Sequence, residues 1–181
     1  MHRSAYVVAP LTAVALLLPV PLLLGATYPM VLPHAWHRLL HIVGAVLFLG
    51  NIVVSAFWSL FALRSGDPVR IRFAMAVVNW SDAAFTAPGV LLLMGNGLVL
   101  SGPWGGPTGA SWIGWGLAIL AGVAVVWIAS VVPDQHRLLR MAGAEGGLPP
   151  GFSRVARRWT LVGGASALLP FLALGLMVLK T

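Results

Sequence analysis

Five stretches of the chain are almost free of charge, and each is close to the roughly 20 residues that an α-helix needs to cross a hydrocarbon core about 30 Å thick. They cover approximately residues 6–26, 36–63, 73–100, 112–132 and 159–179. The apolar runs are continuous and show no period-two alternation, which favours a helix bundle over a β-barrel. The sequence therefore predicts an all-α, polytopic membrane protein with five transmembrane helices.

The composition agrees with this class and excludes several kinds of chemistry. Of the 181 residues, 59% are hydrophobic and 8% are charged, and the mean hydropathy of +0.93 lies far above that of a soluble domain. The absence of cysteine excludes disulfides, thiolate metal sites and cysteine nucleophiles. The chain has only 4 acidic residues, so catalysis by paired carboxylates is nearly excluded.

Basic residues lie mainly in the connections between the apolar stretches, so the formal net charge of +7 indicates topology rather than a nucleic-acid surface. Arg3 and the arginines of two loops, residues 63–72 and 133–158, fall on one side of the membrane. The other side has only Arg38 and Lys180. The positive-inside rule therefore predicts a cytoplasmic N-terminus and an external C-terminus.

The first apolar stretch differs from the other four. Pro10, Pro19 and Pro21 each remove a backbone donor, so we expect an irregular, peripheral helix that is retained as a membrane anchor. The chain then divides into an N-terminal anchor helix with its outer loop (residues 1–35) and a four-helix transmembrane bundle (residues 36–181).

The second stretch carries its polar residues on one side. At about 100° per residue, one narrow sector contains His37, His41, Gly44, Phe48, Asn51, Ser55 and Ser59. Apolar residues cover the rest of the helix and suit lipid. We therefore expect this sector to face other helices.

His37 and His41 are the candidate metal or cofactor ligands. Their i, i+4 spacing lets two imidazoles share one copper or zinc ion, although no glutamate or third intramembrane histidine completes such a site. His41 could instead be an axial ligand of haem iron, with Arg38 and Lys180 near the propionates and Gly44 leaving room for a flat ring. The alternative is that both histidines are hydrogen-bonded packing residues at a wet helix end.

Asp82 is the only acidic residue within an apolar stretch, and intramembrane carboxylates are often functional. It shares a second polar sector with Asn79, Thr86 and Asn96. Asp82 could relay protons or pair with an arginine. It could equally be a neutral or amide-paired residue that joins the second and third helices through Asn51 and Asn79. Pro88 is expected to leave the Ala84 carbonyl without a donor and to kink the helix here.

Several short motifs resemble a bacterial integral-membrane family, the domain of unknown function numbered twenty-two sixty-nine. They are residues 40–45 (LHIVGA), 48–51 (FLGN), 65–68 (SGDP), 82–89 (DAAFTAPG) and 96–97 (NG). The resemblance covers the chain from Trp36 to the C-terminus. It implies a multi-pass protein of the bacterial cytoplasmic (inner) membrane, with the first helix as an addition.

The segment around His41 is also distantly similar to the first helix of the bacterial membrane-bound protoporphyrinogen oxidases and of the copper-resistance D proteins. The likeness to the oxidases implies a haem or porphyrin contact at His41. Leu40 stands where those proteins have phenylalanine, and Phe48-Leu49-Gly50 stands where they have a tryptophan-glycine pair.

These observations favour a membrane protein that binds a b-type haem or related tetrapyrrole near the outer face, in redox or electron-transfer service. The candidate site residues are His41, His37, Arg38, Asn51, Asp82 and Lys180. Two alternatives stay open: an accessory subunit packed against other membrane subunits or copies of itself, and copper or zinc binding or transport. No nucleotide-binding motif and no nucleophile with its base is found, so the sequence assigns no catalytic residue and leaves enzymatic activity open. The expected surroundings are lipid, without nucleic acid.

Overall fold

The computed structural model describes residues 10–180 except 12 and 16, and within them it is helical with no strand. Four helices are long and apolar enough to cross a membrane: His34–Ser65, Pro68–Leu100, Ser111–Met141 and Phe152–Leu179. The all-α class and four of the predicted spans are therefore confirmed.

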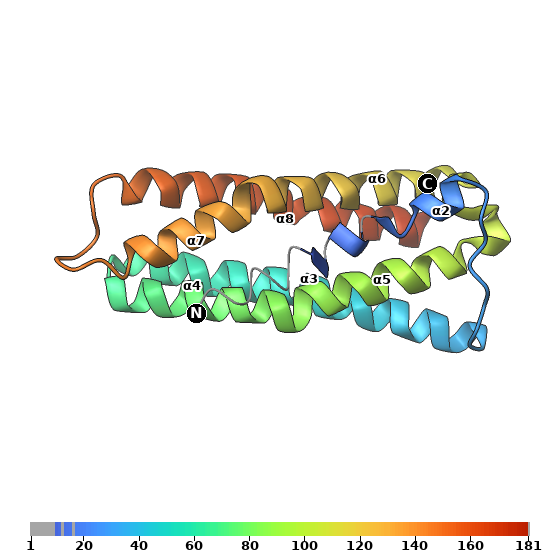
Figure 1. Cartoon of the computed structure of the whole chain (residues 1–181), viewed down its shortest axis with the longest axis horizontal. Coiled ribbons are helices and arrows are strands. Elements are labelled where there is room, and N and C mark those ends of the chain that lie inside the picture. The colour runs from blue at the N-terminus through green and yellow to red at the C-terminus, as the bar shows by residue number, and fades with distance from the viewer. Residues whose placement is uncertain (1–9, 12, 16, 181) are drawn as a thin grey trace.

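The four long helices form two antiparallel hairpins that lie along each other (Figure 1). In hairpin 1, α3 (His34–Ser65) packs against a long helix made of α4 (Pro68–Ser81), the π-helical turn η1 (Asp82–Thr86) and α5 (Ala87–Leu100). In hairpin 2, a helix made of α6 (Ser111–Val126), the π-helical turn η4 (Trp127–Val131) and α7 (Val132–Met141) packs against α8 (Phe152–Leu179). The hairpins meet where α4 contacts α7 and where α3 contacts α8.

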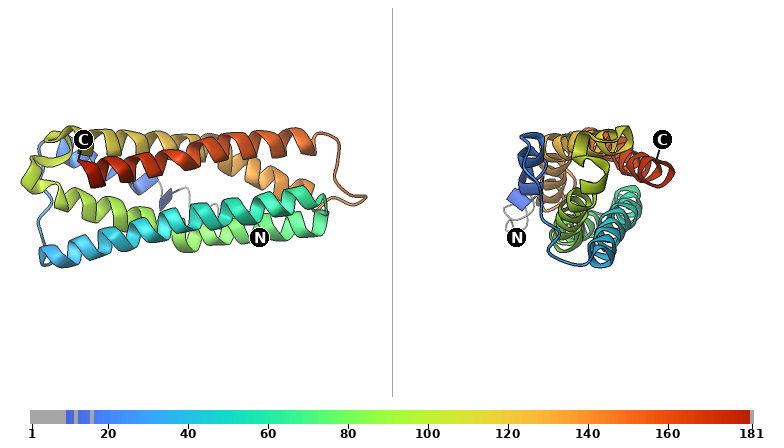
Figure 2. Two further views of the ribbon diagram at one scale, coloured as in Figure 1. Left: turned by 180° about the vertical axis from the view of Figure 1, so that it is seen from behind. Right: turned by 90° about the vertical axis from the view of Figure 1, so that its right-hand side faces the viewer.

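The bundle has two chemically different ends (Figure 2). One end, here called the arginine end, holds the α3–α4 turn and the α7–α8 connection. The other, called the tryptophan end, holds the start of α3, the C-terminus of α8 and the α5–α6 connection. That connection contains the short 3-10 turns η2 (Gly102–Trp104) and η3 (Gly106–Thr108).

The connections at the arginine end are shorter than the sequence suggested. Only Gly66 and Asp67 separate α3 from α4. Gly66 adopts φ 65°, and an Asp67 carboxylate oxygen caps α4 by accepting the Val69 N–H at 2.8 Å. The expected loop at 133–158 is likewise mostly helical, because α7 continues to Met141 and α8 begins at Phe152. Both predicted loop extents were therefore wrong, since a drop in hydropathy shows where lipid contact ends and does not require the helix to stop.

The arginine end also contains the main hydrophobic core. Its buried members come from α4, α7, the connection after α7, and the start of α8: Ile71, Met75, Leu138, Leu139, Ala142 and Phe152. On α7 these leucines share the buried side, and Arg137 and Arg140 lie on the exposed side. The helix therefore continues past the apolar stretch as an amphipathic segment.

Two glycines allow the helices of hairpin 1 to approach closely. A Cβ built on Gly44 would lie 2.5 Å from the Leu93 nitrogen and 2.7 Å from the Gly89 oxygen. A Cβ on Gly89 would lie 3.0 Å from the Phe48 nitrogen. Because backbone atoms are in the way on both sides, neither position has room for a side chain.

The predicted first span lies partly outside the described residues. Within them, Ala13–Leu23 is a shorter apolar helical stretch, and Leu18 and Pro19 form a turn just before α2 (Val20–Leu23). The Tyr28 hydroxyl donates to the Leu18 carbonyl at 2.7 Å, and α2 packs on η3. The irregularity expected from the prolines is therefore present in this part of the chain.

Candidate functional site

The polar sectors predicted on the second and third apolar stretches face each other and meet a third element. Five side chains from α3, α4, η1 and α7 form what we call the central polar cluster: Asn51, Asn79, Asp82, Thr86 and Gln135. All five are buried. The cluster lies inside the bundle, between the two hairpins.

Asp82 is the acceptor at the centre of this cluster. The Asn51 amide donates to one Asp82 carboxylate oxygen, Oδ1, at 3.0 Å and to the Thr86 hydroxyl at 2.8 Å. Thr86 in turn lies 3.2 Å from the same Oδ1. Among the described residues Asp82 has no ion-pair partner, so its hydrogen bonds come from neutral groups. The arrangement agrees with the interpretation of Asp82 as a residue that joins helices through amides.

Gln135 extends the cluster into hairpin 2 and was not singled out by the sequence. Its amide donates to Asp82 Oδ2 at 3.2 Å and to the Asn79 side-chain oxygen at 3.0 Å. The sequence interpretation placed Gln135 in the loop at 133–158. The loop assignment was wrong, because α7 continues past the apolar stretch. The sequence feature that could have identified Gln135 as buried is its helical spacing from Val131 and Leu138, since all three lie on one side of the helix.

Two of the three long helices that supply the cluster contain a π-helical turn just before a proline. η1 precedes Ala87-Pro88, and η4 precedes Val132-Pro133. The Ala87 N–H bonds the Asp82 carbonyl five residues earlier, and this wider turn relieves the ring clash that a proline causes in an α-helix. A π turn therefore accompanies the irregularity expected at Pro88.

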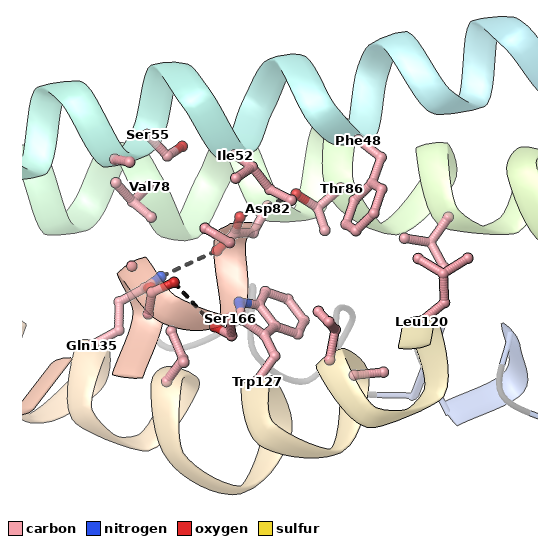
Figure 3. Close-up of a pocket in the computed structure, with 18 of the residues that line it drawn as sticks. Phe48, Ile52, Ser55, Val78, Asp82, Thr86, Leu120, Trp127, Gln135 and Ser166 are labelled. Atoms are coloured by element: carbon pink, nitrogen blue, oxygen red, sulfur yellow. Dashed lines mark hydrogen bonds between the residues drawn. The ribbon is translucent and has the colours of Figure 1, made fainter. Parts of the chain in front are cut away.

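A cavity of about 290 Å³ lies between the hairpins beside this cluster. Figure 3 shows Phe48 and Asp82 projecting into it from hairpin 1, and Trp127 and Gln135 from hairpin 2. Most of the lining is apolar, and Trp159 adds a third aromatic residue. Ala15, from the N-terminal segment, also lines the cavity and is buried.

The two candidate histidines both face α5 but differ in their hydrogen bonding. Nδ1 of His37 lies 2.8 Å from the side-chain oxygen of Asn96, and its Nε2 accepts the Leu32 N–H at 3.3 Å. Nδ1 of His41 lies 2.8 Å from the Leu93 carbonyl oxygen. Because both nitrogens of His37 are occupied, sharing a metal with His41 would require it to release Asn96 or Leu32.

The space around His41 also differs from the expectation. Gly44 does not leave room for a flat ring, because the backbone of α5 fills that space. The glycine that accommodates the imidazole is Gly97: a Cβ there would lie 2.8 Å from the His41 Cε1 and 2.9 Å from its Nδ1. Within the described residues, no group of three or more His, Cys, Asp or Glu side chains is placed to hold a metal ion.

The remaining candidates lie apart from the central polar cluster. Arg38 is exposed on the first turns of α3. The Lys180 ammonium lies 4.9 Å from the ring centroid of Trp104, which packs edge-on against Trp112 at 5.4 Å. Both cations are therefore at the tryptophan end, as are His37 and His41, while Asn51 and Asp82 lie deeper.

A second buried carboxylate, Asp134, stands next to Gln135 on α7 and differs from Asp82 in having a cationic partner. The Arg158 Nε donates to Asp134 Oδ2 at 2.6 Å, and its terminal nitrogen donates to the other carboxylate oxygen. Arg137 lies 3.7 Å away. This ion pair ties α7 to α8 near the arginine end.

Comparison with known proteins gives one match. The family described as a predicted integral membrane protein (DUF2269) matches residues 36–181. No curated protein and no solved structure matches the chain. The match begins at Trp36, where the sequence resemblance began, and it includes all of the four-helix bundle except the first two residues of α3. The chain therefore belongs to the DUF2269 family of predicted integral membrane proteins.

Proposed function

We propose that this protein binds a b-type haem or related tetrapyrrole through His41 near the outer face of a bacterial cytoplasmic membrane, in redox or electron-transfer service. The observation that carries the proposal is the hydrogen bond between the His41 Nδ1 and the Leu93 carbonyl oxygen, 2.8 Å long. A carbonyl only accepts, so Nδ1 carries the proton and Nε2 is left with its lone pair. A backbone carbonyl that orients one ring nitrogen is the usual outer partner of a metal-ligating histidine.

The other residues support this role to different degrees. Nε2 of His41 has no hydrogen bond to any described residue, whereas both nitrogens of His37 do. His41 would therefore hold the iron, and the exposed Arg38 at the same end would meet a propionate. When bound, the group would supply one-electron chemistry. His41 does not line the cavity between the hairpins, so this function does not use that cavity.

An absorption spectrum of the purified protein, with haem supplied during expression, tests the proposal. We expect a Soret band that is lost in His41→Ala and retained in His34→Ala, a matched change of an exposed histidine on the same helix. Protein without the band after haem supply, or a band that is equal in His41→Ala and wild type, would refute the role of His41.

The proposed topology has five spans and a cytoplasmic N-terminus. It is supported by the arginines gathered on the helix ends at one end of the bundle: Arg64, Arg70, Arg72, Arg137, Arg140, Arg154 and Arg157 lie there. The chain has no cysteine, so single cysteines can report the side of the membrane. We expect Thr108→Cys to react with an impermeant maleimide in intact cells and Ala144→Cys to react only after permeabilisation. The opposite pattern would reverse the topology.

A second candidate function is that of an accessory subunit, packed against other membrane proteins or further copies of this chain. Glycines on the outer sides of two helices support it: Gly50 on α3 and Gly122 on α6 are exposed, and a Cβ on either of them would meet nothing within 4 Å. Small residues on a lipid-facing side allow another helix to approach closely. Cross-linking in native membranes should give a discrete larger species that Gly50→Leu or Gly122→Leu weakens. Detection of the monomer alone for the wild-type protein would contradict this role.

A further inference from the structure

We propose that the cavity between the two hairpins binds a small aromatic ammonium ion. Its N–H group donates a hydrogen bond to Asp82, and its ring packs among Phe48, Trp127 and Trp159. His41 does not line this cavity, so the inference is independent of the tetrapyrrole proposal. Three features of the cavity lead to it: its size, its unbalanced charge and its aromatic lining.

The size and polarity of the cavity suit a small apolar molecule with one polar group. Its volume of about 290 Å³ is near the lower end for small-molecule sites. The polar side chains that line it are few and include Asp82, Thr86 and Gln135, gathered in the central polar cluster. A ligand would therefore place its polar group beside Asp82 and its apolar part toward the aromatic residues.

The charge of Asp82 is not balanced by any described residue around the cavity. Among the described residues, the lining contains no lysine, arginine or histidine, and none of the ion pairs includes Asp82. Burying a carboxylate without a cation is unfavourable inside a membrane protein. A cationic ligand would remove this imbalance, whereas an anionic one would increase it.

The carboxylate also has acceptor capacity left. Its Oδ1 accepts hydrogen bonds from Asn51 and Thr86, but its Oδ2 accepts only one, from Gln135, among the described residues. A carboxylate can accept about four hydrogen bonds. A further N–H donor can therefore bind without displacing the amides.

The aromatic lining of the cavity favours an ammonium ion over a neutral hydrogen-bond donor such as an alcohol. Phe48 comes from α3, Trp127 from η4 and Trp159 from α8, so aromatic rings reach the cavity from both hairpins. Figure 3 shows Phe48 and Trp127 in the same space as Asp82. Aromatic faces attract cations when both are removed from water, and they also pack against a ligand ring.

Equilibrium dialysis of radiolabelled 2-phenylethylammonium tests the proposal, using the purified full chain in lipid nanodiscs and empty nanodiscs as the blank. We expect saturable binding that Asp82→Asn weakens on the order of 30-fold or more, because an amide keeps the shape but removes the charge. Asp67→Asn is the matched control. It makes the same change at an exposed helix cap, where asparagine serves equally well, and it should bind as wild type does. The neutral analogue 2-phenylethanol should compete poorly.

Each other outcome counts against the proposal. Absence of saturable binding by the wild type up to millimolar concentrations, or equal binding by Asp82→Asn, would remove the site. Competition by 2-phenylethanol as strong as by the ammonium ion would show a neutral hydroxyl ligand and overturn the cationic class. If circular dichroism shows that Asp82→Asn does not fold, Ala124→Phe decides, because Ala124 lines the cavity from α6, which supplies no residue of the central polar cluster. Unchanged binding in Ala124→Phe would place the ligand elsewhere.

Discussion

The contact between Gly44 and the backbone of α5 gives the sharpest prediction about what holds hairpin 1 together. In Gly44→Ala the new methyl group would start 2.5 Å from the Leu93 nitrogen. Ordinary van der Waals contact begins at 3.4 Å, so α3 and α5 must separate by about 1 Å. The obstructing atoms belong to a helix backbone and cannot rotate out of the way.

This separation would break the hydrogen bonds that cross the same interface. Four side-chain hydrogen bonds join α3 to α5 or η1 between described residues: His37 to Asn96, His41 to Leu93, and Asn51 to Asp82 and to Thr86, all 2.8–3.0 Å long. At about 0.6 kcal/mol per interhelical bond in a membrane, their loss amounts to about 2.4 kcal/mol. Alanine is preferred over glycine in a helix by about 0.4–1 kcal/mol, so the net destabilisation of Gly44→Ala should be about 1.5–2 kcal/mol.

Gly50→Ala is the matched control, because Gly50 lies on the same helix and a Cβ there would meet nothing within 4 Å. It should stabilise the protein by about 0.4–1 kcal/mol. The assay is reversible unfolding in mixed micelles with increasing SDS, followed by circular dichroism. The two variants should shift the midpoint in opposite directions. A Gly44→Ala protein that is as stable as Gly50→Ala would refute the close helix contact and the reasoning built on it.

Two further predictions concern α7. Asp134→Asn removes the charged partner of Arg158, whose side chain is 53% exposed, so we expect the free energy of unfolding to fall by about 1–2 kcal/mol in the same assay. Arg158→Lys should lose part of this stability, because lysine lacks the second hydrogen bond to Asp134. Wild-type stability in both variants would contradict the ion pair. Gln135→Leu removes the two bonds from Gln135 to Asn79 and Asp82, so it should destabilise the bundle by about 1 kcal/mol. A Gln135→Leu protein of wild-type stability would indicate that packing alone holds the hairpins together there.

Much of the site could be predicted because helical periodicity is a local property. The spacing of His37, His41 and Asn51 put them on one side of a helix, and the structure turns that side toward α5 and η1. The spacing of Asn79, Asp82 and Thr86 did the same for the next helix, and the two sides meet at Asp82. Polar groups in a membrane need partners inside the protein, so two such stripes have strong reason to face each other.

The errors came from treating the end of an apolar stretch as the end of a helix. Gln135 was assigned to a loop, and its contact with Asp82 was therefore missed. The position of Gly44 indicated a close approach, but the sequence could not say whether a cofactor or a backbone fills the space. The structure places α5 there.

The amino-acid order alone was enough for the helical class, four of the membrane spans, the family, and the residues that face inward on the second and third stretches. The family follows from short motifs. The class, the spans and the inward-facing residues follow from hydropathy or from period, and both depend only on neighbours along the chain. Which helices pair, where the cavity forms, and that Asp82 meets Gln135 from the other hairpin were decided by the tertiary structure. The contact between Asp82 and Gln135 joins residues 53 positions apart. Such contacts depend on how the helices pack around prolines, π turns and glycines.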